Sequence, residues 1–381
     1  DTERSKALFL KALDLELQAA SFFSAEKDSE PTRSILYRSA AALAYHAREY
    51  EHAEQLVAKG LSGFPPSEIK EELRALQDNI NFHHHMARKG GELANNEMQM
   101  MLWGNATGYG IIPVDLLVTR IEQITKIFYR TVERLTNQPY RTVGGPTKET
   151  RDIYGLYLNG FAPGSFEVSF SIGEPTKQLP LLPDQVPEKI EPKEIIEEVI
   201  SCFELLQEDE LQNLQERFNN DDYYQNFVGV ARQMAPDGDS IKIIGLASLQ
   251  NGLERTVGLT RRKKEIPTPS QLAVSAGDKK DETGTVIQLT GMLKLADNLR
   301  TSGEYGTVTI IDSNNKPVPV LVPVTQMQDV VQPFFDENVT ITGYKIGRRI
   351  YFEDIETAKE VAEKAYEDKN APSSKQGSLF D

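Results

Sequence analysis

The chain has 381 residues, of which 39% are hydrophobic and 26% charged, and a formal net charge of −15. Its length predicts about two to four domains, and its acidic balance disfavours a protein that coats nucleic acid over its whole surface. A single cysteine, Cys202, excludes an internal disulfide and a cysteine-rich zinc site, which favours a reducing, cytoplasmic setting. No segment has the length and apolarity of a membrane span, and the charged stretch DTERSKALFL does not read as a secretory signal.

Residues 1–96 predict a helical domain, because apolar residues recur at helical spacing between breaks such as DSEPT and GFPP. The stretch EYEHAEQLVAKGL, with small residues at Ala53 and Gly60 and a proline at Pro65, resembles a tetratricopeptide repeat. This resemblance implies a helix–turn–helix unit that binds a protein partner. One such repeat cannot bury its own apolar face, so the neighbouring helices are expected to complete the stack.

Residues 97–264 predict an α+β domain. A strand at 97–103 and the turn GNATGYG precede a long helix with one apolar stripe, formed by Val114, Leu117, Ile121, Ile124 and Phe128. Two alternating runs around APGS predict a hairpin. The acidic stretch KEIIEEVISCFELLQEDELQNLQERF then predicts one amphipathic helix, followed by the helix YYQNFVGVARQMA and two strands, SIKIIGLAS and RTVGLTRR.

Residues 265–283 have the composition of a linker, and 284–355 predict a five-stranded barrel of the OB type. That expectation rests on the element order, with a short helix between the third and fourth strands, and on Gly291. A polar helix at 356–370 and a disordered tail at 371–381 are expected to follow. The predicted fold class is therefore multi-domain α+β, with a helical N-terminus, a central α+β domain and a C-terminal barrel.

The sequence carries no catalytic, cofactor or metal-binding motif. GNATGYG lacks the glycine and lysine spacing of nucleotide-binding loops, and three consecutive histidines, His83, His84 and His85, point in different directions on a helix. Cys202 lies on the apolar side of its helix, where a buried filler is expected rather than a nucleophile. We therefore expect a protein that is not an enzyme; the alternative is an enzyme of unrecognised type in the central domain.

The barrel raises the alternative of a nucleic-acid-binding accessory factor. Residues 260–350 hold twelve basic and ten acidic residues, whereas 182–222 hold thirteen acidic and three basic ones. Barrels that bind single strands combine aromatic rings with a basic groove. The candidate contacts are Lys345, Arg348, Arg349, Tyr344 and Tyr351, with Tyr305 and Phe352 as further rings. The competing interpretation is that these rings pack in the barrel.

The last residues, KQGSLFD, resemble the short peptide by which bacterial replication and repair proteins bind the DNA sliding clamp. The resemblance implies that Leu379 and Phe380 enter a hydrophobic pocket while Gln376 and Ser378 bind beside it. Gly377 stands where that peptide commonly has leucine. The alternative is an end that folds back on its own domain or has no partner.

The stretches LWGNATGYGIIPVDLL and GFAPGSFEVSF, together with the barrel, are similar to a group of multi-domain bacterial proteins. This resemblance implies a bacterial origin and the domain order, but no activity. We thus expect a cytoplasmic interaction or adaptor protein whose helical N-terminus binds a protein partner. Roles in DNA maintenance or phage defence are expectations that follow from the tail and the resemblance. No membrane association and no cofactor are expected.

Overall fold

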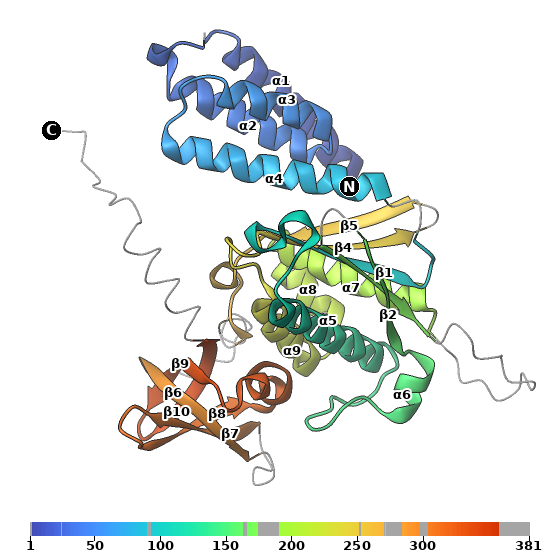
Figure 1. Ribbon diagram of the computed structural model, residues 1–381, viewed down its shortest axis with the longest axis vertical. Helices are drawn as coiled ribbons and strands as arrows, with labels where there is room; N and C mark the ends of the chain where they lie inside the picture. Colours follow the sequence, from blue (N-terminus) through green and yellow to red (C-terminus); the bar gives the residue numbers. More distant parts are fainter. Residues whose placement is uncertain are drawn as a thin grey trace, which may run out of the picture.

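A computed structural model describes residues 2–23, 25–89, 93–162, 166–173, 190–250, 253–269, 271, 284–297 and 304–357. Figure 1 shows a helical N-terminal part, a central part with a sheet, and a C-terminal barrel. The fold is mixed α+β, as the sequence predicts. None of the described helices combines the length and the apolarity that crossing a membrane requires. The predicted helix at 356–370 and the predicted tail fall almost wholly outside the described residues.

The N-terminal part consists of α1 (Thr2–Ala20), the 3₁₀ turn η1 (Lys27–Ser29), α2 (Thr32–His46), α3 (Tyr50–Leu61) and α4 (Ser67–Lys89). Small residues let these helices approach closely. Ala44 and Ala53 are fully buried, and a Cβ at Gly60 would lie 2.9 Å from Leu73 Cδ1. The predicted close packing of small residues is therefore present between α2, α3 and α4.

The central sheet has the strand order β2-β3-β1-β4-β5, and every neighbouring pair is antiparallel. Its strands are β1 (Glu97–Trp103), β2 (Leu156–Ala162), β3 (Phe166–Ile172), β4 (Ile243–Gln250) and β5 (Leu253–Leu259). The β2–β3 pairing confirms the predicted hairpin, although its turn residues lie outside the described ranges.

Helices cover one face of this sheet (Figure 1). They are α5 (Val114–Leu135), α7 (Pro192–Gln207), α8 (Leu211–Phe218) and α9 (Asp221–Met234), while α6 (Lys148–Ile153) lies between α5 and β2 in the chain. Their apolar sides form one core with the sheet residues Met98, Met100 and Leu102. Exposed Leu158 and Tyr157 mark β2 as an edge strand.

Two local predictions in the central domain were wrong. The acidic stretch forms α7 and α8 instead of one helix, because Asp209 adopts a left-handed conformation with φ 61° that ends the first helix. The segment GNATGYG contains the 3₁₀ helix η2 (Asn105–Gly110) instead of a plain turn. In addition, Val114, the first member of the predicted apolar stripe of α5, is 74% exposed.

The C-terminal part is a closed barrel with the order β10-β8-β7-β6-β9, in which β8 and β10 are parallel and the other pairs antiparallel. Its strands are β6 (Thr285–Asp297), β7 (Tyr305–Asp312), β8 (Pro317–Pro323), β9 (Asn338–Ile346) and β10 (Arg349–Thr357). Between β8 and β9 the chain forms α11 (Val324–Gln326), the π-helix η5 (Met327–Val331) and the 3₁₀ helix η6 (Gln332–Phe334). This order is that of an OB-like barrel, as expected.

Candidate interaction surfaces

The candidate reactive groups of the sequence are considered first. No group of three or more His, Cys, Asp or Glu side chains in the described ranges could hold a metal ion. Cys202 is buried, and burial together with the nearby Glu198 carboxylate raises the pKa of its thiol to about 12. His84 Nε2 of α4 lies 3.5 Å from Glu54 Oε2 of α3.

The outer face of the barrel carries a row of apolar and aromatic side chains. In the strand register, Tyr344 of β9 lies opposite both Val286 of β6 and Tyr351 of β10, and Tyr351 lies opposite Leu321 of β8. Directly opposed residues share one side of a sheet. Val286 is 59% exposed, so this side faces outward. The row crosses four of the five strands.

A fifth side chain extends this outer row. The ring of Tyr305, at the start of β7, meets the ring of Tyr351 edge-on with 5.5 Å between centroids. Phe352, in contrast, is only 4% exposed and packs inside the barrel. Of the rings that the sequence suggested as a platform, three are thus brought together outside and one belongs to the core.

The three predicted basic residues do not all lie on the same side as this row. Arg349 stands two residues before Tyr351 on β10, which places both on the outer side of the strand. Arg348 is exposed in the β9–β10 turn, where Gly347 has φ 60°. Lys345 is also exposed but follows Tyr344 directly, so it leaves the opposite side of β9. The structure therefore joins Tyr344, Tyr351 and Arg349 and sets Lys345 apart.

Carboxylates lie at both borders of the row. Burial, with the charge of Glu353, raises the pKa of the Tyr344 phenol. Glu304 precedes Tyr305, and its charge adds to the burial that raises the pKa of Asp222 at the start of α9. A polyanion on this face would therefore be attracted at the β9–β10 turn and repelled near α9.

The barrel is held to the central domain by buried polar contacts. Arg130 Nε of α5 donates to Asp329 Oδ2 of η5 at 2.7 Å, and Asn226 Nδ2 of α9 donates to the same oxygen at 3.0 Å. Arg232 of α9 lies 2.8 Å from Asp354 of β10. Since these groups are largely buried, the barrel and the central domain form a continuous packed unit.

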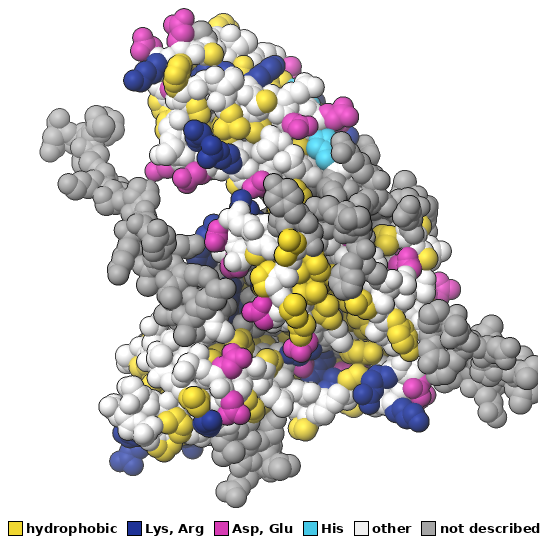
Figure 2. All heavy atoms as spheres, in the orientation of Figure 1, with side chains coloured by type: hydrophobic (Ala, Val, Ile, Leu, Met, Phe, Trp, Pro, Cys, Tyr) yellow, Lys and Arg dark blue, Asp and Glu magenta, His cyan; other side chains and the backbone are white. Residues whose placement is uncertain are grey.

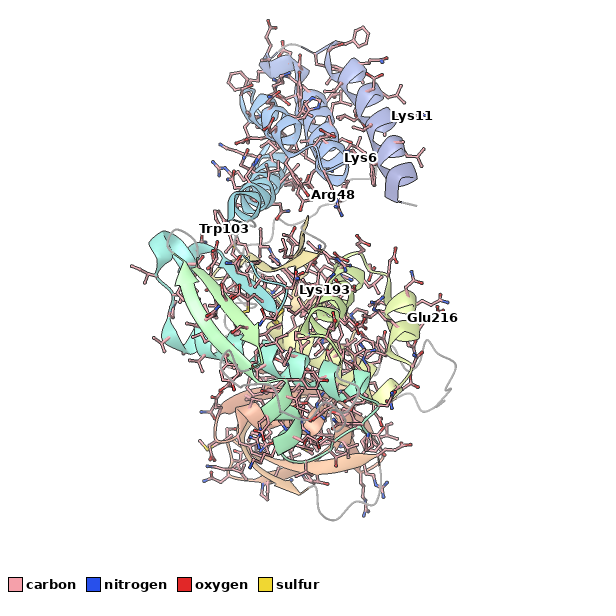
Figure 3. All side chains as sticks on the ribbon, turned by 90° about the vertical axis from the view of Figure 1, so that its right-hand side faces the viewer. Lys6, Lys11, Arg48, Trp103, Lys193 and Glu216 are labelled. Carbon is pink, nitrogen blue, oxygen red and sulfur yellow. The ribbon has the colours of Figure 1, made fainter. Side chains whose placement is uncertain are left out.

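The described contacts between the helical domain and the central domain are more exposed. Lys242 at the start of β4 pairs with Asp78 of α4 at 3.0 Å, and the two side chains are 37% and 30% exposed. Arg48 lies between α2 and α3, and its side chain points toward the central domain (Figure 3). Its positive charge counters the burial that raises the pKa of Glu208 after α7.

Helix α1 has two apolar faces. Leu13, Leu17 and Ala20 face the α2–α4 bundle, and the ring of Phe9 stacks on His46 of α2 at 5.5 Å. A second set, with a spacing of seven residues, is exposed: Leu8 is 59%, Leu15 67% and Phe22 85% exposed. Because seven residues nearly complete two helical turns, Leu8 and Leu15 lie on one side of α1. We call Leu8 and Leu15, with Phe22 in the turn after α1, the α1 stripe.

The spacing of apolar residues predicts a helix at the position of α1, but the α1 stripe was not predicted. A signal was present, because Leu8, Ala12, Leu15 and Ala19 recur on the side opposite to Leu10 and Leu17. The predicted tail residues Gln376, Ser378, Leu379 and Phe380 lie outside the described residues.

Comparison of the chain with family models, with curated proteins and with solved structures finds no match.

Proposed function

We propose that this chain is a non-enzymatic interaction protein, an adaptor, that binds a protein partner through its helical N-terminal domain. The observation that carries the proposal is the α1 stripe. Leu8 and Leu15 are each more than half exposed on a helix whose opposite side already packs against α2. Helices in repeat stacks are apolar on two sides because each one packs between two neighbours.

The chemistry of the α1 stripe fits an amphipathic helix of a partner protein. Leucines one heptad apart provide the spacing that a second helix can pack against. The flanking side chains Lys11, Asp14 and Gln18 are exposed and polar, as at the border of a helix-binding surface. The tetratricopeptide-like stretch EYEHAEQLVAKGL supports the same class of function.

The experiment compares the full chain with the variant Leu8→Glu/Leu15→Glu. Each protein is immobilised and exposed to bacterial lysate; the captured proteins are identified, purified and titrated singly. A partner that binds the parent chain and loses binding at least about tenfold in the variant supports the proposal. Phe64→Ser, at a 62% exposed site after α3, is the matched control and should bind normally. Equal binding by all three proteins would contradict the proposal.

A second candidate function is binding of single-stranded nucleic acid by the barrel. It is favoured by the outer row, in which the Tyr305 and Tyr351 rings meet and Arg349 projects from the same side. Bases stack on such rings, and each stacked base contributes about 1–3 kcal/mol. Arg348 and Arg349 supply cations at one end of the row.

The test of the second candidate is titration of a fluorescent oligothymidine of sixteen nucleotides by anisotropy, at several salt concentrations. Tyr351→Ala and Arg349→Ala should each weaken binding, and Arg349→Ala should also flatten the salt dependence. Lys316→Ala, which removes another exposed cation, from the β7–β8 turn, is the control. Binding that the control weakens as much as Arg349→Ala would indicate diffuse charge attraction instead of a site.

A link to DNA maintenance through the tail remains a separate proposal. Leu379 and Phe380 are expected to bind a bacterial sliding clamp, with Gln376 and Ser378 beside them. The measurement is titration of the full chain with a purified clamp, next to Leu379→Ala/Phe380→Ala. Saturable binding that the double variant abolishes would support the link, and no binding at tens of micromolar would remove it.

A further inference from the structure

A second exposed apolar patch lies where η2 meets α5, far along the chain from the α1 stripe. Ile111 is 71%, Val114 74% and Val118 46% exposed. Val114 and Val118 are four residues apart on α5 and therefore neighbours on one side of it. Figure 2 shows hydrophobic side chains gathered over this region of the surface. We call Ile111, Val114 and Val118 the α5 patch.

The α5 patch is continuous with the core. Leu117 and Ile121, on the adjacent side of the same helix, are partly buried and pack against the central hydrophobic cluster. Of the patch residues, Val114 belongs to the apolar stripe that the sequence predicted for α5, and it is the outward end of that stripe. Exposed apolar groups that extend a core at the surface mark contact sites in soluble proteins.

The exposed charges beside the α5 patch are acidic. Between Asn105 and Lys126 the chain has two acidic and two basic side chains, and both acidic ones, Asp115 and Glu122, are exposed. Arg120 is buried and donates to Gln233 O at 2.8 Å. Lys126 Nζ is turned toward the barrel and lies 3.3 Å from Asp329 O, although its charge still reaches Glu122.

A third acidic group lies at the start of η2, the segment that leads to Ile111. Asp239, an exposed residue before β4, accepts a hydrogen bond from Asn105 Nδ2 at 2.7 Å there. Asp115 and Glu122 therefore present negative charge on the same helix as Val114 and Val118, and Asp239 adds a carboxylate at the other end of η2. The cations of the same segment are drawn inward by carbonyl acceptors of other elements.

We propose that the α5 patch binds an amphipathic segment with basic flanks from a partner protein. The apolar side of the segment covers Val114, Val118 and Ile111, and its Lys or Arg residues face Asp115 and Asp239. A second copy of this chain fits less well, because a two-fold contact would bring two acidic borders together. The inference is independent of the α1 stripe, which lies in another domain.

The test uses the full chain and a defined probe, a fluorescein-labelled 18-residue amphipathic helix built from Leu and Lys. The comparison peptide has Glu at every Lys position. Because the chain carries a net charge of −15, it attracts any cationic peptide. Variants therefore distinguish this general attraction from binding at the α5 patch. Val114→Ser/Val118→Ser removes apolar surface at exposed sites, and Val143→Ser is the matched control at a 62% exposed site between α5 and α6.

The expected result is saturable binding of the Leu/Lys peptide by the parent chain and by Val143→Ser, weakened about tenfold or more in Val114→Ser/Val118→Ser. Asp115→Asn/Asp239→Asn should reduce the affinity and its salt dependence. Circular dichroism checks that each variant is folded. Equal affinity in parent and Val114→Ser/Val118→Ser, or equally tight binding of the Leu/Glu peptide, would overturn the proposal. Self-association that depends on Val114 and Val118 would also overturn it, in favour of a second copy.

Discussion

Arg130 of α5 and Asp329 of η5 form an ion pair of 2.7 Å although 199 residues separate them in the chain. Their side chains are only 5% and 6% exposed. Burial by itself would lower the pKa of Arg130, but the charge and hydrogen bond of Asp329, together with Tyr140 and Glu133, outweigh it and raise the pKa. The guanidinium also lies 4.4 Å from the ring of Tyr140, whose hydroxyl donates to Thr325 O. The barrel is thus fixed to the central domain by charges that neither part could bury alone.

The first prediction concerns this pair. Asp329→Ala removes the nearer of the two carboxylates that pair with buried Arg130 and leaves only Glu133, at 3.3 Å. We therefore expect a loss of about 3 kcal/mol in the stability of the unit formed by the central domain and barrel. Urea unfolding, followed by amide hydrogen exchange in α5 and in the barrel strands, measures the change. Both regions should lose protection together, because the pair joins them.

Lys294→Ala is the control for this prediction. Lys294 pairs with Asp336 on the barrel surface, with side chains 47% and 76% exposed, so its removal should change stability by at most about 0.5 kcal/mol. A loss in Asp329→Ala no larger than in Lys294→Ala would show that the buried pair does not hold the barrel.

The barrel illustrates what the sequence can predict. Apolar and polar residues alternate in strands such as β7 and β9, and such a pattern determines which side of a strand is buried. Buried Val308 and Ile310 alternate with partly exposed Thr307 and Thr309 in β7, as that rule requires. The order of elements, five strands with a short helix between the third and fourth, is then sufficient to predict the OB-like topology.

The sequence could not predict features that depend on tertiary contacts. The periodicity of α5 includes Val114, yet only the packing of the other helices decides that this residue remains outside. The Arg130–Asp329 pair joins distant segments and leaves no local signal. The break between α7 and α8 occurs where periodicity continues, because Asp209 takes a backbone conformation that the apolar pattern does not report.

The second prediction concerns Gly291, which the sequence analysis associated with the barrel. A Cβ at this position would overlap Ile311 O and lie 2.8 Å from Ile311 C, on the neighbouring strand β7. Backbone atoms cannot rotate away, so Gly291→Ala should destabilise the barrel by about 1–3 kcal/mol. Thermal unfolding measures the effect. Gly145→Ala, where no atom lies within 4 Å, should leave the melting temperature nearly unchanged.

The third prediction is a pH dependence at Glu198. Burial alone would raise the pKa of this carboxyl, but hydrogen bonds from Arg217 and Arg134 outweigh it and lower the pKa below 4.5. A carboxyl whose pKa is lower in the native state than in the unfolded state stabilises the fold at every pH above its unfolded-state pKa. This stabilisation is lost as the pH falls through the native-state pKa. Glu198→Gln should therefore cost about 2 kcal/mol at pH 7, and its difference from the parent should shrink below about pH 4.5.

Urea unfolding of the parent chain and of Glu198→Gln at pH 7, 5 and 3.5 tests this dependence. Glu97→Gln is the comparison, since Glu97 also accepts hydrogen bonds, from Asn159 and from the backbone of Ala94, but contacts no arginine in the described structure. A destabilisation by Glu198→Gln that stays constant over this range would contradict the assignment of the effect to the carboxylate charge.

The fourth prediction concerns Cys202, which is 1% exposed and has a thiol pKa raised to about 12. Because the thiolate is the reactive form, the native chain should react with a thiol-specific disulfide reagent at pH 8 far more slowly than the chain unfolded in urea does. Glu198→Gln removes a charge that opposes thiolate formation, but it leaves the side chain buried, so labelling of the folded variant should also be slow. Fast labelling of the native parent chain would show that the segment of α7 around Cys202 opens to solvent, and it would place a reactive thiol in the central domain.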